Sequence, residues 1–309
     1  MPADESRVPA LVRRLAAARD PSPRTRRVLL VVGLLAFVVM LVVSLRSLEI
    51  GFDEIAWGPL VFAGLVLTPL TILGNAAELR VMAAGTADRP LPGVEAVRVV
   101  VLATAANLLP IPGAALVRIQ ALRTRGAGGT AATGINVAGA GMWLGSGLLI
   151  AGLALLPLRG AGALLVAAAG LAGCVVAALI VRKVARPGRA ARTTAALVAV
   201  EVLVTVLYGL RLLVVLAGLR VDLDLQQALV IALSAPLSAA AGVFPSGIGL
   251  AEAISGLLAP AVALPVAVGV AATGLNRVVG LAVTAPVAAW FAARSPVDDA
   301  TDGDAPPSA

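Results

Sequence analysis

The chain has no histidine and only one cysteine, Cys174, among its 309 residues. Without histidine a protein has no imidazole general acid or base, no Ser-His-Asp triad and no His/Cys metal site. A single cysteine also excludes an intrachain disulfide. Because Cys174 sits in an apolar run, we expect it to be a small buried hydrophobic residue and not a reactive thiol. These absences predict a protein that is not an enzyme and that binds no metal.

Charged residues are also scarce, at 13% of the chain against 60% hydrophobic residues. Several apolar runs reach the ~20 residues needed to cross the hydrocarbon core of a bilayer. The composition therefore predicts an all-α integral membrane protein. The net charge of +7 comes from arginines that lie just outside the apolar runs, where the positive-inside rule accounts for them without a nucleic-acid partner. We expect a bacterial cytoplasmic membrane protein with a cytoplasmic N-terminus.

The sequence divides into a basic cytoplasmic tail (1–27), a membrane domain (28–294) and a disordered polar tail (295–309). Hydropathy predicts about eight hydrophobic segments in the membrane domain, which we interpret as about six full spans and two broken-helix hairpins. The full spans are expected at 28–43, 57–75, 129–156, 163–181, 193–218 and 264–293.

Two of the apolar segments are interrupted by proline and glycine. Broken helices at membrane depth occur only inside protein or beside a wet cavity, because every backbone polar group there must be satisfied. We expect a first re-entrant hairpin from half-helices 92–107 and 113–123, entering from the cytoplasm, and a second from 226–244 and 248–259, entering from outside. Such a pair is typical of inverted-repeat transporters, although the internal symmetry is a hypothesis here. The predicted backbone breaks are Pro110, Pro112, Gly113, Pro245, Gly247 and Gly249.

Ionisable residues near the breaks are the candidate substrate-binding residues. Arg118 and Arg277 offer planar paired donors that match a phosphate, although Arg118 could also serve the positive-inside rule. Glu252 would bind an amine or a proton, or else cap its broken helix. Glu201 lies inside a span and needs a cation, Arg118 or Arg277, so it forms either a structural ion pair or a headgroup or proton site. The predicted set is Asn107, Arg118, Glu201, Glu252, Asn276 and Arg277.

The two breaks also resemble a known family. The first reads Asn107-Leu-Leu-Pro110-Ile-Pro112-Gly113 with Arg118 downstream, and the second reads Pro245-Ser246-Gly247-Ile-Gly249-Leu-Ala-Glu252 with Arg277 downstream. Over 28–294 the chain resembles the lysylphosphatidylglycerol synthase transmembrane region, the flippase-like membrane half of the multiple peptide resistance factor. The resemblance implies movement of a polar-headed lipid between leaflets. The chain departs from the family pattern at Ala114, Ala115, Ser246 and Ala251, which leaves the substrate open.

The expected function is therefore that of a flippase-like lipid translocase. The family's soluble synthase domain is not expected in a chain that ends at Ala309, so synthase activity is not implied. One alternative is an ion- or proton-coupled carrier of a small polar solute, and another is a non-transporting partner of a lipid-modifying enzyme; a homo-oligomer also stays open. No GxxxxGK[ST] motif occurs, so we expect no nucleotide or other cofactor. A lateral opening to the bilayer would favour a lipid, and a closed central cavity would favour a solute.

Overall fold

The computed structural model describes residues 23–49, 51–106, 113–241 and 247–293. All regular secondary structure in these ranges is helical, which confirms the predicted all-α class. Most of the predicted N-terminal tail and all of the C-terminal tail lie outside the described residues, as do Asn107, Pro110, Pro112 and Pro245.

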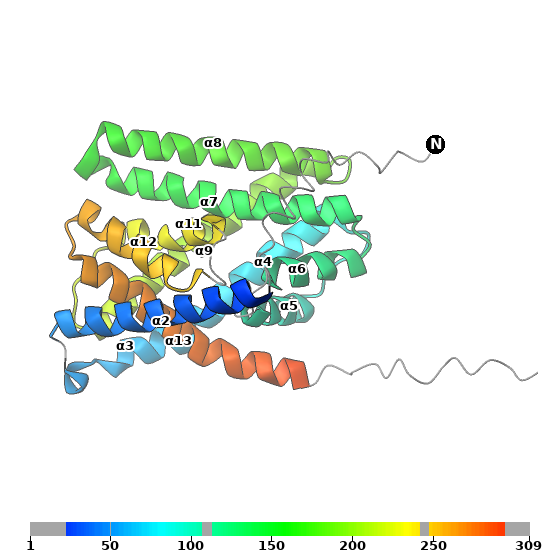
Figure 1. The fold of residues 1–309 in the computed structure, drawn as a ribbon. Coiled ribbons are helices and arrows are strands. Elements are labelled where there is room, and N and C mark those ends of the chain that lie inside the picture. The colour runs from blue at the N-terminus through cyan, green and yellow to red at the C-terminus, as the bar shows by residue number, and fades with distance from the viewer. Residues whose placement is uncertain (1–22, 50, 107–112, 242–246, 294–309) are drawn as a thin grey trace, which may run out of the picture.

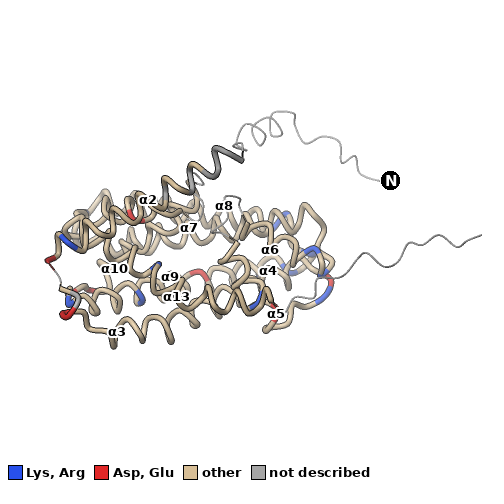
Figure 2. Tube along the Cα trace, turned by 60° about the horizontal axis from the view of Figure 1, so that its bottom comes forward, with Lys and Arg blue, Asp and Glu red and all other residues tan. Residues whose placement is uncertain are grey.

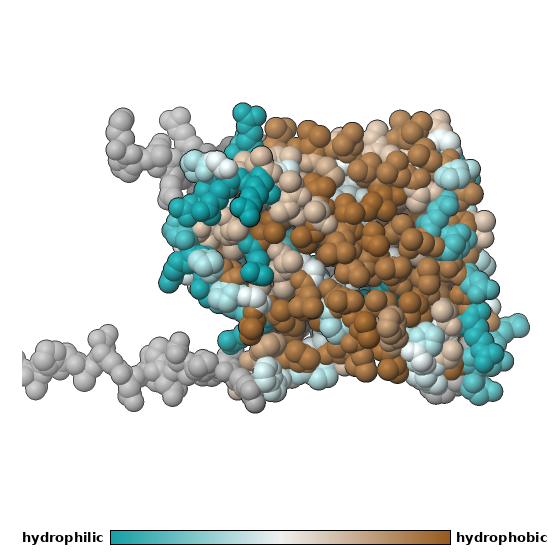
Figure 3. Space-filling view, turned by 180° about the vertical axis from the view of Figure 1, so that it is seen from behind, coloured by the Kyte–Doolittle hydropathy of each residue, from teal (hydrophilic) through white to brown (hydrophobic). Residues whose placement is uncertain are grey.

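Five helices in the described ranges are long and apolar enough to cross a membrane. They run roughly along one direction (Figure 1), and a broad hydrophobic belt separates two hydrophilic ends of the molecule (Figure 3). This arrangement fits the expected multi-pass membrane protein. The five are the continuous helix Trp57–Thr86, α7 (Gly129–Arg159), α8 (Ala161–Val184), α9 (Ala190–Gly218) and α13 (Val266–Ala293); α2 (Pro23–Ser47) packs against α13.

The helix Trp57–Thr86 corrects one prediction. We expected this span to end near Asn75, which would place Glu78 in the loop that follows. The helix instead continues to Thr86, through α3 (Trp57–Phe62), a π-helical turn (Ala63–Leu67) and α4 (Thr68–Thr86). Leu79 and Met82 are fully buried on its core face, so the apolar stripe runs past Glu78 and encloses it within the bundle.

Pairs of short helices flank the two Pro/Gly segments. The first pair is α5 (Gly93–Ala106) and α6 (Gly113–Thr124), which pack against each other. Around the second break, α10 (Leu225–Ala232) and α11 (Ser234–Ala241) come before it, and α12 (Leu250–Leu258) with the 3-10 turn Ala259–Val262 comes after it. At 1.5 Å per residue, no arm of either pair reaches the ~30 Å of a hydrocarbon core. The short helices occupy the predicted half-helix positions, with ends that differ by a few residues.

Small residues bring α7 and α8 together along their length. A Cβ atom on Gly145 would lie 2.7 Å from the backbone nitrogen of Cys174, and one on Gly170 would collide with the backbone of Leu149. Gly152 is enclosed in the same way by the backbone of Ala167. Backbones this close gain extensive dispersion contact without a hydrophobic driving force, as helix pairs in lipid require.

Candidate functional site

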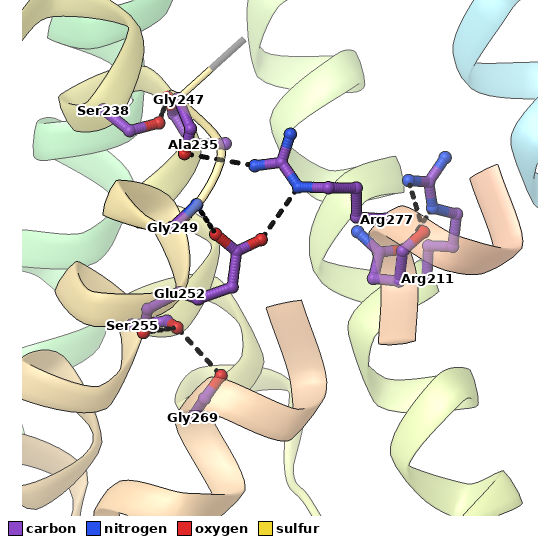
Figure 4. Close-up of polar contacts among 10 residues, drawn as sticks. Arg211, Ala235, Ser238, Gly247, Gly249, Glu252, Ser255, Gly269 and Arg277 are labelled. Atoms are coloured by element: carbon purple, nitrogen blue, oxygen red, sulfur yellow. Dashed lines mark hydrogen bonds and ion pairs between the residues drawn. The ribbon is translucent and has the colours of Figure 1, made fainter. Parts of the chain in front are cut away.

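An ion pair between Glu252 and Arg277 lies at the start of α12. Arg277 Nε donates to Glu252 Oε1 at 2.8 Å, and Arg277 Nη2 donates to the carbonyl oxygen of Gly247 at 3.3 Å. The other carboxylate oxygen of Glu252 accepts the backbone N–H of Gly249 at 2.8 Å. The carboxylate thus joins α13 to the backbone that leads into α12, and the Arg277 side chain points toward that backbone (Figure 4).

Local backbone geometry places Glu252 in this position. Gly247 and Gly249 both have positive φ, +63° and +80°, a region that glycine enters without steric cost. Gly249 is the N-cap of α12, so the third helical residue, Glu252, reaches back to the N-cap amide, as in a capping box. The capping role proposed for Glu252 from sequence is therefore present, and it coexists with the ion pair.

Close packing of α12 on α13 brings Arg277 within reach. Ser255 Oγ donates to the carbonyl oxygen of Gly269 at 2.9 Å. A Cβ atom on Gly269 would collide with the carbonyl oxygen of Ser255, so only glycine permits this approach. Two turns further along α13, Arg277 then extends to Glu252.

A second charged cluster joins α4, α6 and α9. Arg118 of α6 forms a salt bridge with Glu78 of α4. Helix α4 contacts α9 from Gly74 beside Val204 to Gly85 beside Thr193, so Glu78 faces Glu201 of α9. Glu78 and Glu201 are buried, and the Arg118 side chain is 21% exposed. Of the two cations expected for Glu201, the structure therefore supplies Arg118, with Glu78 between them. Sequence analysis missed Glu78 because it assigned the residue to a loop.

Several polar atoms around this second cluster have no hydrogen-bond partner. Glu201 Oε1 and Arg118 Nε are both buried and unpartnered, and so is the hydroxyl of Thr205, one turn from Glu201 on α9. On the opposite side, α7 approaches at Gly139, where a Cβ atom would lie 2.8 Å from Glu78 Oε1. Buried polar atoms without partners are rare in folded proteins and often mark a functional site.

Arg211 is a third buried charge, and sequence reasoning did not include it in the site. Its Nε donates to the side-chain oxygen of Asn276, its Nη1 to Thr68 Oγ1 at 3.4 Å, and its guanidinium lies 5.5 Å from the ring centre of Tyr208. All of these partners are neutral, and the residue is only 8% exposed. An isolated arginine inside an apolar span was the available signal.

The π-helical turn before Thr68 helps to position this arginine. Thr68 precedes Pro69, which has no backbone N–H and cannot continue an ordinary helical ladder. The Thr68 amide and hydroxyl both bond to the carbonyl oxygen of Ala63, five residues earlier. Such π bulges are common at functional sites, and this one directs the Thr68 hydroxyl toward Arg211.

The two ends of the predicted site differ in charge. The cluster of Glu78, Glu201 and Arg118 has two carboxyl groups for one guanidinium. Along α13, Arg277 is paired with Glu252, whereas Arg211, bound to the neighbouring Asn276, has neutral partners. The break segments 107–112 and 242–246 contain no ionisable residue, so they add no charge to either group.

These positions modify the predicted binding mode. Arg118 and Arg277 were expected to offer their donors directly to a phosphate, but each already holds a glutamate. A phosphate at Arg277 would have to share the guanidinium with Glu252. Asn276 joins the site through Arg211, and the buried Gly113 lets the start of α6 approach the end of α5, because a Cβ atom there would collide with the carbonyl oxygen of Ala106.

An apolar cleft of about 270 Å³ opens between α5 and α13. Its lining contains one polar side chain, that of Thr284, and several of its alanines are exposed on the lateral surface. Leu281, in the lining, follows Arg277 by one helical turn, so the cleft begins next to the ion pair. The lining residues are Leu102, Ala105, Leu281, Thr284, Ala285, Ala288, Ala289 and Ala292.

Comparison of the chain with protein-family models, with curated proteins and with solved structures found no match.

Proposed function

We propose that this protein is a flippase-like lipid translocase, which moves a polar-headed phospholipid or lipid-linked molecule between the leaflets of the bacterial cytoplasmic membrane. The observation that supports it most is Arg211, a buried guanidinium with neutral partners that bonds Asn276, the residue next to Arg277. A charge at membrane depth is energetically costly, and such residues commonly mark a substrate or ion pathway. An anionic phosphate would balance it.

The arrangement of the short helices supports a transport mechanism. We infer that α5 and α6 form a re-entrant hairpin from the cytoplasmic side and that α10 to α12 form one from the outside, related as an inverted repeat. Lysine and arginine gather where α4 and α6 end (Figure 2), so the positive-inside rule assigns this end and the N-terminus to the cytoplasm. Short helices that end within the bilayer would direct their termini at a substrate near the midplane.

The site also suggests how a headgroup is held. A phosphate would bind Arg277 and Arg211, since guanidinium groups bind phosphate through paired donors. Glu252, which keeps its hydrogen bond from the Gly249 amide, would then pair with the amine of a zwitterionic headgroup. Entry of a zwitterionic headgroup would thus replace the Glu252–Arg277 pair by a Glu252–amine pair and a phosphate shared by the two arginines, whereas only a net anionic headgroup would also balance the charge of Arg211.

The cleft between α5 and α13 favours a lipid over a soluble substrate. It opens on the lateral hydrophobic surface, and its apolar lining suits an acyl chain. Because it starts one turn from Arg277, a single amphiphile could place its head at the arginine and its chain in the cleft.

The decisive experiment is a leaflet-exchange assay in liposomes that contain the purified protein and one labelled lipid at a time. Zwitterionic, anionic and cationic headgroups should be compared for the wild type, R277A, E252Q and the matched surface variant R123M. We expect faster exchange of phosphate-bearing lipids by the wild type and R123M, with a large loss in R277A and E252Q. Equal rates in all four proteins, or no exchange above protein-free liposomes, would refute the proposal. Uptake of a soluble phosphorylated solute without lipid exchange would favour the carrier alternative.

A further inference from the structure

We propose that Glu78 and Glu201 together bind one proton, and that this proton is the coupling ion of the transporter. The proton site itself stands on the geometry of the cluster, whereas the coupling rests on the proposed function.

The first argument is the contact between the two carboxyl groups. They face each other where α4 packs on α9, between the contacts of Gly74 with Val204 and of Gly85 with Thr193, and two ionised carboxylates offer only acceptors. A hydrogen bond between them therefore needs a proton on one of the two. Carboxyl pairs that share a proton in this way titrate as a unit.

The second argument is the charge count in a buried setting. Glu201 is 3% exposed, and one guanidinium, that of Arg118, faces two carboxyl groups. Binding one proton makes the cluster neutral, whereas full ionisation would leave an uncompensated negative charge inside the bundle. Glu78 and Arg118 are the charged groups that face Glu201. The other charges on helices packed around the cluster are as follows: Glu95 pairs with Arg125, Arg277 pairs with Glu252, Arg80 is exposed, Arg98 is half-buried on α5, and Arg211 lies ten residues further along α9.

The third argument distinguishes a proton from a metal cation. Arg118 is bound directly to Glu78, and its positive charge would repel a sodium ion at the same carboxylate. Glu201 Oε1 and Thr205 Oγ1 are buried and have no hydrogen-bond partner among the described residues. Both atoms can therefore still form hydrogen bonds along a proton-transfer path.

The placement of Arg118 explains how a proton could influence transport. Arg118 belongs to α6, the second arm of the first short-helix pair, whereas Glu78 and Glu201 belong to the long helices. When the pair loses its proton, both carboxylates attract Arg118; when it holds the proton, the attraction falls to that of one charge. Proton binding therefore changes how firmly α6 is held against α4 and α9.

Infrared difference spectroscopy of the purified protein in lipid nanodiscs tests the proton site without any transport. At neutral pH the wild type should show the carbonyl stretch of a protonated carboxyl group. Both E201Q and E78Q should lose this band, because the remaining glutamate pairs with Arg118 alone. R118M should gain a second protonated carboxyl, whereas E95Q, at the partly exposed pair with Arg125, should keep the wild-type band. A wild-type spectrum without a protonated carboxyl, or one that both glutamine variants retain, would overturn the proposal.

The coupling is tested in liposomes with an imposed pH gradient. For one proton per lipid, the steady-state leaflet ratio should shift about tenfold per pH unit in the wild type and should not follow the gradient in E201Q. Coupling would be refuted if the leaflet ratio of the wild type did not change with the pH gradient. It would also be refuted if the ratio of E201Q changed with the gradient as much as that of the wild type. If no protein moves lipid, the proposed function and its coupling both fail, and the infrared result still decides whether the pair binds a proton.

Discussion

Glu252 and Arg277 form an ion pair in which the carboxylate is completely buried, whereas the guanidinium side chain keeps 18% of its exposure. The glutamate is fixed at the start of α12 by the Gly249 amide. The arginine is thus the partner through which an incoming headgroup could reach the pair. This asymmetry gives the two residues different expected mutational behaviour.

The first prediction concerns the stability of this pair. E252Q keeps an acceptor for Gly249 but leaves the partly buried Arg277 charge without its carboxylate, so it should lower the free energy of unfolding by up to roughly 3–5 kcal/mol. R277M added to E252Q should recover part of this loss. Reversible unfolding in mixed micelles measures both changes.

The matched control is E95Q, at the partly exposed salt bridge with Arg125. E95Q should lower the free energy of unfolding by less than about 1 kcal/mol, as the loss of a surface salt bridge usually does. If E252Q costs no more than E95Q, the buried pair does not stabilise the contact between α12 and α13.

Sequence predicted the short helices on either side of the two Pro/Gly segments because proline, glycine and hydrophobic length act locally. After the first break α6 begins at Gly113, and after the second break Gly249 caps α12. For Glu201 the sequence left two possible partners, Arg118 and Arg277. It could not decide between them, because charge pairing between helices depends on how the helices are rotated and on which spans are neighbours. Glu78 was missed for a related reason: a glutamate followed by an arginine reads as the end of a span, although the buried stripe continues through Leu79 and Met82.

A second prediction concerns Arg211, which has neutral hydrogen-bond partners. Replacement by methionine removes a desolvated charge and keeps much of the side-chain volume, so R211M should be as stable as the wild type within about 1 kcal/mol, or more stable. If Arg211 binds the phosphate, R211M should also slow lipid exchange by about tenfold or more.

R123M, at an exposed arginine of α6, serves as the control and should change neither property. Thermal unfolding and leaflet exchange can be measured on the same preparations. Unchanged exchange by a stable R211M would show that this charge takes no part in binding the headgroup.

A third prediction uses two glycines one turn apart on α7. G145A should lower the free energy of unfolding by about 1–3 kcal/mol, because the new methyl group would lie 2.7 Å from the Cys174 backbone and force α8 away. G141A should be neutral or stabilising by up to about 1 kcal/mol, since its methyl group would meet Ala177 at an ordinary 3.6 Å and alanine favours the helix. Equal effects of the two substitutions would mean that α7 and α8 do not approach as closely as described.

The last prediction separates a lipid from a soluble substrate through the cleft between α5 and α13. Ala285 lines this cleft and is exposed, so A285W should fill the space where we place an acyl chain without disturbing buried packing. We expect A285W to unfold like the wild type and to lose most of its lipid exchange. L165W, at a position on α8 that is 73% exposed and outside the cleft lining, adds the same ring to the hydrophobic surface and should leave exchange intact. Since a soluble solute would not need the cleft, undiminished exchange by A285W would show that the chain of the lipid takes another path and that the headgroup site alone guides its movement.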